Sequence, residues 1–428
     1  MISWFPKVIN IFKNKELRRK ILFVFFVFIV FRLAANIPIP GIDKSQLEQF
    51  FNNSQLFGFL NIFSGGTLSN FSIVLLGMGP YITAVIVFQL ATMIFPGLER
   101  MYKEEGEQGR KKFNQYARVA TIPLAALQGY GMLAILQSQN VIAQLSSLSL
   151  INFLVTVSAG AVFLMWLGEL ISERGIGNGV SLLIFAGIVA RLPRSLGQTI
   201  ITWDISKLPS YLVFVAVAIL MIGVVVAINE ARRNIPVSYT KRVRGAKVYG
   251  GTSSYLPMNI NPAGVMPIIF ALAILMFPQI IGQVLAGTGN SILVMIAAKI
   301  TWFLSNRWLY GMSYFFLVIG FTYFYTAITF DPKNIASNLQ KSGGFIPGIR
   351  PGKPTSSYLH YVLRKCLFVG AIFLASVAVM PSLIQGSTGV AGFNFLIGGT
   401  ALLIVVSVVL DTLRQIKSQM EMRGYESF

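Results

Sequence analysis

Few residues of this 428-residue sequence are placed to do covalent or metal chemistry. It has one histidine, His360, and one cysteine, Cys366, whereas a metal site needs several His, Cys or carboxylate ligands that converge. The segment 352–355 (GKPT) matches a phosphate-binding loop only in part, because it lacks the glycine spacing and has Pro354 where a Ser or Thr would meet magnesium. We therefore expect no cofactor, no metal and no enzyme activity, and any ATP hydrolysis would belong to a partner.

Ionisable residues inside apolar segments are also few. They are Arg32, Glu169 and Arg191, with Arg194 just beyond. Such residues are costly in a bilayer, and in coupled transporters they mark ion or substrate pathways. Glu169 falls near one end of its segment and Arg191 near the end of another, so both side chains can reach the membrane surface. With no charged site at the bilayer centre, the protein is expected to move its substrate without coordinating it tightly.

The composition indicates the class of protein in which these residues are held. Hydrophobic residues make up 54% of the chain and charged residues 12%, which is about half the charge of a soluble globular protein. These values exclude disorder, collagen and coiled coil, and a single cysteine excludes an internal disulfide. The net charge of +20 is large for so apolar a chain. The composition indicates a polytopic membrane protein.

Ten apolar runs approach the length of about 20 residues that a helix needs to cross the hydrocarbon core. They do not alternate between apolar and polar residues, as strands of a membrane barrel would, so the predicted fold class is all-α. The first, fifth and last are the weakest, and the run 291–304, which contains Lys299, is read as interfacial. The ten predicted spans are 21–35, 71–95, 119–136, 150–171, 180–201, 208–228, 263–285, 310–330, 366–384 and 395–410.

Lysine and arginine counts orient these spans. With the N-terminus inside, cytoplasmic segments hold 28 of the 35 Lys and Arg residues and outer segments hold 6, when Arg191 and Arg194 near the outer end of the fifth span are included. This is the asymmetry expected of cytoplasmic loops. Both termini are therefore predicted to be cytoplasmic, and no signal-peptide cleavage site follows the first span. The spans divide five and five, into halves at 1–202 and 203–428. An odd number of spans in each half makes the halves inverted, as in many transport folds.

Four loop motifs are too distinctive for generic connections. They occur at 64–66 (SGG) with 77–82 (GMGPYI), at 172–179 (SERGIGNG), at 239–242 (YTKR) and at 341–352 (KSGGFIPGIRPG). In this order, on ten spans with inside termini, the chain from about residue 21 to about residue 410 resembles the SecY family of protein-secretion channels. The resemblance implies a central hourglass pore in the cytoplasmic membrane. Unfolded secretory polypeptides cross through it, and membrane-protein helices leave it laterally.

The resemblance also implies that a ring of aliphatic side chains closes the pore. The matching positions are Ile82, Ile86, Ile184, Ile188, Ile269 and Ile404. The sequence adds that the first four form two pairs spaced i, i+4, which places each pair on one helical face. β-Branched side chains are stiff at χ1 and can form a defined aperture, and an apolar constriction excludes ions by dewetting.

A plug and a lateral gate are implied in the same way. The plug, at about 56–72, would fill the outer funnel of the idle channel, although the residues themselves fit an ordinary outer loop equally well. Its candidate residues are Leu60, Phe63, Ser64, Gly65 and Gly66. The gate would lie at spans two and seven, where prolines let a helix bend, and Gln89 would help to hold it closed with no partner assigned. The candidate gate residues are Pro80, Gln89 and Pro267.

Two large basic loops, 230–262 and 331–365, are expected on the cytoplasmic side. Membrane topology alone explains their charge, but their length, and the stiffening of Arg350 between Pro347 and Pro351, favour a docking role. The candidate docking residues are Lys241, Arg242, Lys247 and Arg350. The resemblance implies that the motor ATPase SecA and the ribosome, whose RNA is a polyanion, bind there. It implies the small subunits SecE and SecG, signal sequences and membrane lipid as further partners.

Two other function classes stay open from the residues alone. A secondary transporter of a small solute also fits ten spans in inverted halves, although the missing midplane charges and the large basic loops argue against it. A membrane enzyme is disfavoured because no paired acid and base is present. The bound substrate separates these classes, since a transporter saturates with a small molecule and a channel holds a polypeptide.

Overall fold

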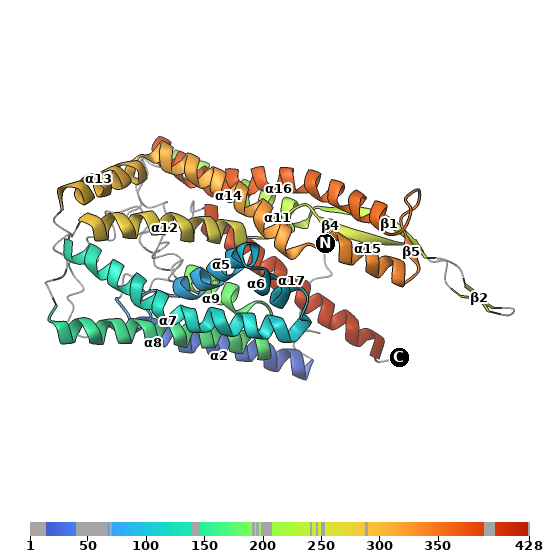
Figure 1. Ribbon diagram of the computed structural model, residues 1–428, viewed down its shortest axis with the longest axis horizontal. Helices are drawn as coiled ribbons and strands as arrows, with labels where there is room; N and C mark the ends of the chain where they lie inside the picture. Colours follow the sequence, from blue (N-terminus) through green and yellow to red (C-terminus); the bar gives the residue numbers. More distant parts are fainter. Residues whose placement is uncertain are drawn as a thin grey trace. The chain divides into compact units, whose positions relative to one another are not determined.

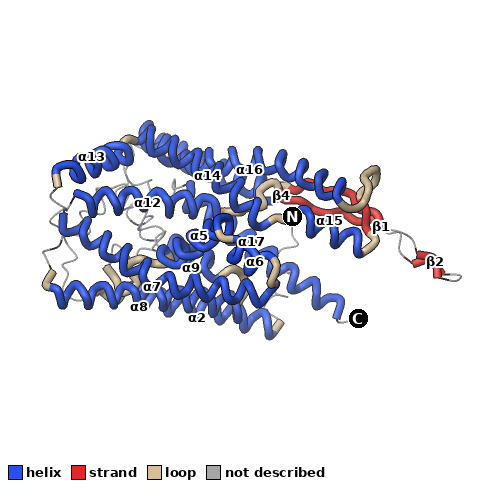
Figure 2. The backbone as a smooth tube through the Cα atoms, viewed as in Figure 1, coloured by secondary structure: helices blue, strands red, loops and turns tan. Residues whose placement is uncertain are grey.

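The structure, a computed structural model, is mainly helical (Figure 1; Figure 2). In its described part the strands lie at 232–259 and at 344–345. The predicted class is all-α, and its coarse form, a mainly helical chain, is confirmed. The strands in the two basic loops were not predicted. The described residues are 14–39, 67, 71–138, 142, 145–190, 193, 197, 208–239, 242–244, 247–249, 253–286, 290–388 and 399–426.

The helices of the described part lie between residues 15 and 426. They are α2 (Lys15–Asn36), α5 (Gly79–Ile94), α6 (Pro96–Lys103), α7 (Gly106–Ser138), α8 (Ser147–Arg174), α9 (Gly179–Val189), α11 (Leu208–Glu230), α12 (Met266–Ala286), α13 (Ser291–Ser305), α14 (Arg307–Thr329), α15 (Pro332–Lys341), α16 (Lys353–Thr388) and α17 (Gly399–Glu426). The strands are β1 (Arg232–Tyr239), β2 (Arg242–Arg244), β3 (Lys247–Tyr249), β4 (Ser253–Asn259) and β5 (Gly344–Phe345).

The chain groups into two units, each built from separate stretches of sequence. The first unit comprises Met1–Asp204, Ala273–Asn306 and Val408–Phe428, and the second comprises Ile205–Leu272 and Arg307–Ser407.

In the first unit, the second predicted span does not begin as a helix. Residues 71–78 form turns, and α5 starts at Gly79, eight residues after the start of the predicted span. The reason is that these residues bond to the backbone of the segment just after α2. The Ile39 amide donates to the Phe71 carbonyl at 2.9 Å, and the Ile73 amide donates to the Ile37 carbonyl at 3.0 Å.

A buried cluster packs beside this segment and joins it to α7 and α8. Phe71 is 1% exposed and stacks on Phe153 of α8, with 5.9 Å between ring centroids. Phe71 has a φ of 45°, a left-handed conformation that costs a bulky residue free energy. Burial of its ring offsets that cost. The members of the cluster are Ile39, Phe71, Leu75, Met132, Leu133, Leu136, Ile142, Phe153 and Val157.

In the second unit, the two large basic loops fold together. β1 lies between β4 and β5 in an antiparallel sheet, with Ile235 opposite Leu256 and Ser238 opposite Phe345. One face of β1 is buried through Ile235 and Val237, while Asn234 and Pro236 are exposed, which is the period-two pattern of a half-buried strand. The predicted loops 230–262 and 331–365 are therefore parts of one layer.

That layer has its own hydrophobic core. Side chains of β1, β4, the segment after β5 and the first turns of α16 pack against one another, and α15 lies beside them (Figure 1). The buried members are Ile235, Val237, Met258, Ile346, Leu359 and Leu363.

Several helices extend past the predicted membrane spans. α7 starts 13 residues before the third predicted span, at Gly106, and α16 starts 13 residues before the ninth, at Lys353. The charged first turns of α7 contain a Lys111–Glu107 ion pair of 3.1 Å spaced i, i+4, the spacing that stabilises a helix surface. Apolar composition marks the membrane part of a helix and not its ends.

Three helical stretches in the described part are long and apolar enough to cross a membrane. They are Ser147–Arg174, Trp308–Lys341 and Lys353–Met380. A fourth is added if Gly79–Ile94 and Pro96–Tyr102, which meet at a bend of 114°, count as one span. Shorter apolar helices lie in the fifth, sixth and seventh predicted spans and at 291–305.

Candidate functional site

The candidate ring isoleucines of the first unit lie on two helices. Ile82 and Ile86 are one turn apart on α5, and Ile184 and Ile188 are one turn apart on α9. Ile86, Ile184 and Ile188 are each 2–3% exposed, whereas Ile82 is half-buried. Each pair therefore presents two stacked aliphatic side chains, as the spacing predicts.

The other two candidate ring residues belong to the second unit. Ile269 lies in the first turn of α12 and is 4% exposed, and Ile404 lies in the second turn of α17 and is 1% exposed. All six positions are thus on helices. Isoleucine has no polar side-chain atom, so such a group can seal a passage but cannot recognise a sequence by hydrogen bonds.

The candidate gate residues include an unsatisfied polar group. Gln89 of α5 is 9% exposed, and its Oε1 has no hydrogen-bond partner in the described part. Elsewhere on α5, Thr83 Oγ1 accepts a hydrogen bond from Gln128 Nε2 of α7 at 3.1 Å. Pro80 lies at the start of α5 and Pro267 in the first turn of α12, where a missing N–H breaks no helical bond.

The 172–179 motif forms a tight turn between α8 and α9. Ser172 Oγ donates to the Gly168 carbonyl at 3.1 Å and accepts from the Gly179 amide at 2.9 Å. Gly177 has a φ of 93°, which favours glycine. A Cβ on Gly179 would overlap the Gly168 carbonyl oxygen. The motif thus brings α9, with its two candidate ring isoleucines, directly against the backbone of α8.

Arg350, the candidate docking residue in the second unit, is exposed on a fixed loop. The Ile349 amide donates to the Ile346 carbonyl at 3.0 Å, and Thr355 Oγ1 donates to the Arg350 carbonyl at 2.9 Å. Because Ile346 is also a member of the buried core of the layer, the loop is anchored on both sides of the guanidinium. A charge held on an ordered loop suits recognition of a polyanion.

Other predicted site residues fall partly or wholly outside the described structure. The backbones of Arg242 and Lys247 lie in β2 and β3, which pair as a hairpin, but their side chains are outside the described residues. Outside it entirely are Lys241 and the plug candidates Leu60, Phe63, Ser64, Gly65 and Gly66.

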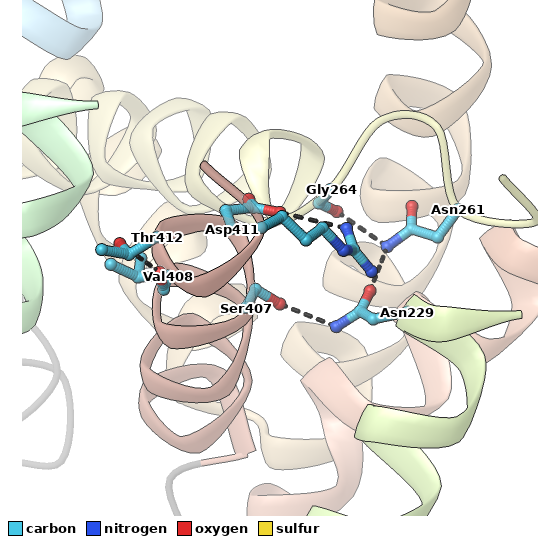
Figure 3. Close-up of polar contacts among 8 residues, drawn as sticks. Asn229, Asn261, Gly264, Ser407, Val408, Asp411 and Thr412 are labelled. Carbon is cyan, nitrogen blue, oxygen red and sulfur yellow. Dashed lines mark hydrogen bonds and ion pairs between the residues drawn. The ribbon is translucent and has the colours of Figure 1, made fainter. Parts of the chain in front are cut away.

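Sequence reasoning missed an ion pair and a chain of hydrogen bonds between polar side chains. Glu169 of α8 forms an ion pair with Arg118 of α7, so it is a paired residue and not simply one that reaches the membrane surface. Asn229, Asn261 and Ser407 form a buried hydrogen-bonded chain in the second unit (Figure 3). The only indication of these interactions in the sequence is that polar residues stand near the ends of apolar runs.

No group of three or more His, Cys, Asp or Glu side chains in the described part could hold a metal ion. His360 is exposed on α16. The described geometry therefore offers apolar contacts, stiff turns and an exposed basic loop.

Comparison with known proteins gives concordant matches. The SecY family model matches residues 72–413. Protein translocase subunit SecY of Streptomyces scabiei is 40% identical, with 97% of this chain and 98% of that protein covered. The same subunit of Thermotoga maritima is 41% identical, with 98% and 96% covered.

Two solved structures share the fold at low identity. One, described as the structure of a protein conducting channel, has a TM-score of 0.64 and 19% identity, with 94% of this chain and 92% of that chain covered. The other, Sec61 in the canine ribosome-channel complex from the endoplasmic reticulum, has a TM-score of 0.61 and 18% identity, with the same coverage.

Proposed function

This chain belongs to the SecY family, and from that premise we propose that it is the pore-forming subunit of a protein-conducting channel. It passes unfolded secretory polypeptides across the cytoplasmic membrane and releases membrane-protein helices sideways into lipid. The observation that carries the proposal is the match to translocase subunits along almost the whole chain. A backbone in bare hydrocarbon leaves polar groups unsatisfied at several kcal/mol each, so a water-filled conduit is needed.

The proposed architecture has ten transmembrane helices in two inverted halves, 1–202 and 203–428, around an hourglass pore. Both termini lie in the cytoplasm. The asymmetry of 28 against 6 Lys and Arg residues supports this orientation. The long apolar helices α8, α14 and α16 support the membrane setting.

The narrowest point of the pore is a ring of six isoleucines. It is formed by Ile82, Ile86, Ile184, Ile188, Ile269 and Ile404, of which five are buried and one is half-buried. Their helical positions and their lack of polar atoms support this role. A dewetted apolar gasket blocks ions, yet it accepts any polypeptide because it offers no hydrogen bonds.

The channel opens in two directions. A plug at about 56–72 leaves the outer funnel, and a lateral gate opens at α5 and α12. Pro96 after α5 and Pro278 inside α12 support bending at the gate. Among the described residues Gln89 Oε1 has no hydrogen-bond partner, which supports a polar contact there that changes between states.

Partners supply the driving force and dock on the layer that carries Arg350. The motor SecA and the ribosome are proposed to bind this layer through Lys241, Arg242, Lys247 and Arg350, while SecE and SecG complete the membrane complex. The ordered loop around Arg350 supports docking, and the ribosome bound to the similar Sec61 channel supports that partner. ATP hydrolysis takes place in the motor, and this chain is not an enzyme.

A reconstitution experiment tests the proposed function. The chain is placed in lipid vesicles with its small subunits, and a labelled secretory precursor is added with the motor and ATP. We expect the precursor to become protected from external protease only in vesicles that contain the chain. Absence of protection, together with saturable uptake of a small solute, would instead establish a secondary transporter.

A further inference from the structure

We propose that Asn229, Asn261 and Ser407 couple the three-stranded sheet to α17, the helix that carries Ile404. The inference rests on the proposed function, in which the sheet layer docks a partner and Ile404 belongs to the pore ring. The three residues would transmit the effect of partner docking on the sheet to Ile404. The family resemblance assigns this role to no particular residues.

The hairpin of β1 and β4 joins the helices at a rigid base, which we call the hairpin root (229–231 and 260–261). The Ile260 amide donates to the Ala231 carbonyl at 3.0 Å, which closes the base of the hairpin. A Cβ on Gly370 of α16 would lie 2.6 Å from the Ile260 carbonyl oxygen, so α16 packs directly on the root. Movement of the sheet is therefore passed to the root as a whole.

Two side chains of the root continue the path toward α17. Asn261 Nδ2 donates to Asn229 Oδ1 at 3.0 Å and to the Gly264 carbonyl at 3.2 Å. Asn229 Nδ2 then donates to Ser407 Oγ at 2.8 Å. Figure 3 shows Asn261, Asn229 and Ser407 pointing toward one another from the loop after β4, from α11 and from α17.

The orientation of both amides follows from their partners. Turning the Asn261 amide over would face its oxygen to two other oxygens, Asn229 Oδ1 and the Gly264 carbonyl. Turning Asn229 over would face its NH₂ group to the NH₂ group of Asn261. The chain of bonds consequently runs in one direction, from the root to the Ser407 hydroxyl.

All three side chains are buried, at 9%, 7% and 4% exposure for Asn229, Asn261 and Ser407. Apolar surfaces can slide past one another, whereas a buried hydrogen bond weakens steeply when its length or angle changes. Ser407 lies three residues after Ile404 on the same helix, so the two side chains are close on its surface. The bond to Ser407 therefore sets the rotation of the helical turn that carries Ile404.

One atom of the network is free to accept a hydrogen bond in a second arrangement of these side chains. Asn261 Oδ1 is buried and has no hydrogen-bond partner in the described part, which is unfavourable for an acceptor away from water. A shift of the root that brings a donor to this oxygen recovers the lost interaction. The network is thus able to exchange one set of bonds for another when a partner moves the sheet.

An isosteric pair of variants isolates the Ser407 hydroxyl. Ser407→Thr keeps the hydroxyl, and Ser407→Val has the same shape without it. Ser376→Ala is the matched control, since Ser376 is exposed on α16 and donates to Ile372 of its own helix at 2.8 Å. The complete complex is placed in planar bilayers, and non-translating ribosomes are the probe. Ribosome affinity and ion conductance are measured with and without ribosomes.

We expect Ser407→Val to bind ribosomes as the wild type does and to keep the basal conductance. Its ribosome-dependent rise in conductance falls by about fivefold or more, as expected when a coupling of ordinary strength is removed. Ser407→Thr and Ser376→Ala keep the full rise. Asn229→Ala combined with Ser407→Ala loses no more than either change alone, because both break the same link.

Three results with the variants would overturn the inference. A Ser407→Val complex with a higher basal conductance and an undiminished ribosome response shows that the bond only supports the closed ring. Additive losses in the double variant show two separate effects. Equal responses of Ser407→Thr and Ser407→Val show that the hydroxyl has no part. A wild-type complex that does not bind ribosomes refutes the proposed docking itself, before any variant is compared, whereas one that binds them with no rise in conductance refutes the coupling alone.

Discussion

Replacing Ile404 by Asn is expected to open the closed ring to water and ions. Ile404 is 1% exposed, so the closed state loses nearly the full burial free energy of its side chain, about 1.5–3 kcal/mol. The carboxamide that replaces it is buried without a designed partner, at a further cost of about 1–3 kcal/mol. In an open, hydrated pore the same carboxamide is solvated, and neither cost applies.

The closed state is thus destabilised against the open state by roughly 3–6 kcal/mol, and each 1.4 kcal/mol changes an equilibrium about tenfold. We expect the open fraction of an idle channel to rise by about two to four powers of ten. The assay is ion conductance of the reconstituted complex without partner or substrate. A second readout is export of precursors with defective signal sequences, which the wetted ring should admit.

Two control variants separate the seal from the fold. Leu403→Asn buries the same carboxamide at the next position, which is 0% exposed but lies about 100° around the helix. It should lower the thermal stability without a comparable conductance. Ile404→Val loses one methyl group and keeps the β-branch, so it should stay sealed. An Ile404→Asn channel as tight as the wild type, or a Leu403→Asn channel that conducts as well, would refute the ring assignment.

Further changes test the docking loop, the motif turn and the sheet layer. Arg350→Glu should weaken ribosome co-sedimentation and leave the melting temperature within about 1 °C, since exposed charges contribute little to stability; unchanged binding would contradict a docking role. Gly179→Ala should lower stability by about 1–3 kcal/mol because its Cβ meets the Gly168 carbonyl. The control Gly223→Ala, whose Cβ meets no described atom within 4 Å, should be neutral or stabilising; equal effects in a melting experiment would contradict the close packing. Ile235→Ala should cost about 2–5 kcal/mol and expose the β1 amides to hydrogen exchange, and unchanged protection would show that the layer does not depend on its core.

Apolar runs predict where helices cross the membrane but not where they end. The runs 150–171 and 208–228 fall inside α8 and α11 with few residues to spare. At 71–78 the same reasoning fails, because these apolar residues bond to the backbone at 37–39 in place of an intrahelical partner. Hydropathy indicates which residues are buried, but it does not indicate which backbone groups are hydrogen-bonded to one another.

Long-range polar contacts were beyond the reach of sequence reasoning. Asn229 and Ser407 are 178 residues apart, and each reads separately as a polar residue at the end of an apolar run. Ile235 and Val237 do alternate with polar and proline residues, so the sheet had a readable period-two signal. It was obscured by the basic residues around it, which favoured a loop.

A disulfide cross-link tests the central claim, that a polypeptide passes through the isoleucine ring. Cys366 is replaced by Ser, a single cysteine is placed at Ile86, and a secretory polypeptide with its own cysteine is stalled partway through export. The control places the cysteine at Val87, which is 45% exposed and on another face of α5. We predict an adduct at position 86 only when the chain is stalled, and none at position 87. Export that proceeds with no adduct at position 86 would contradict the account.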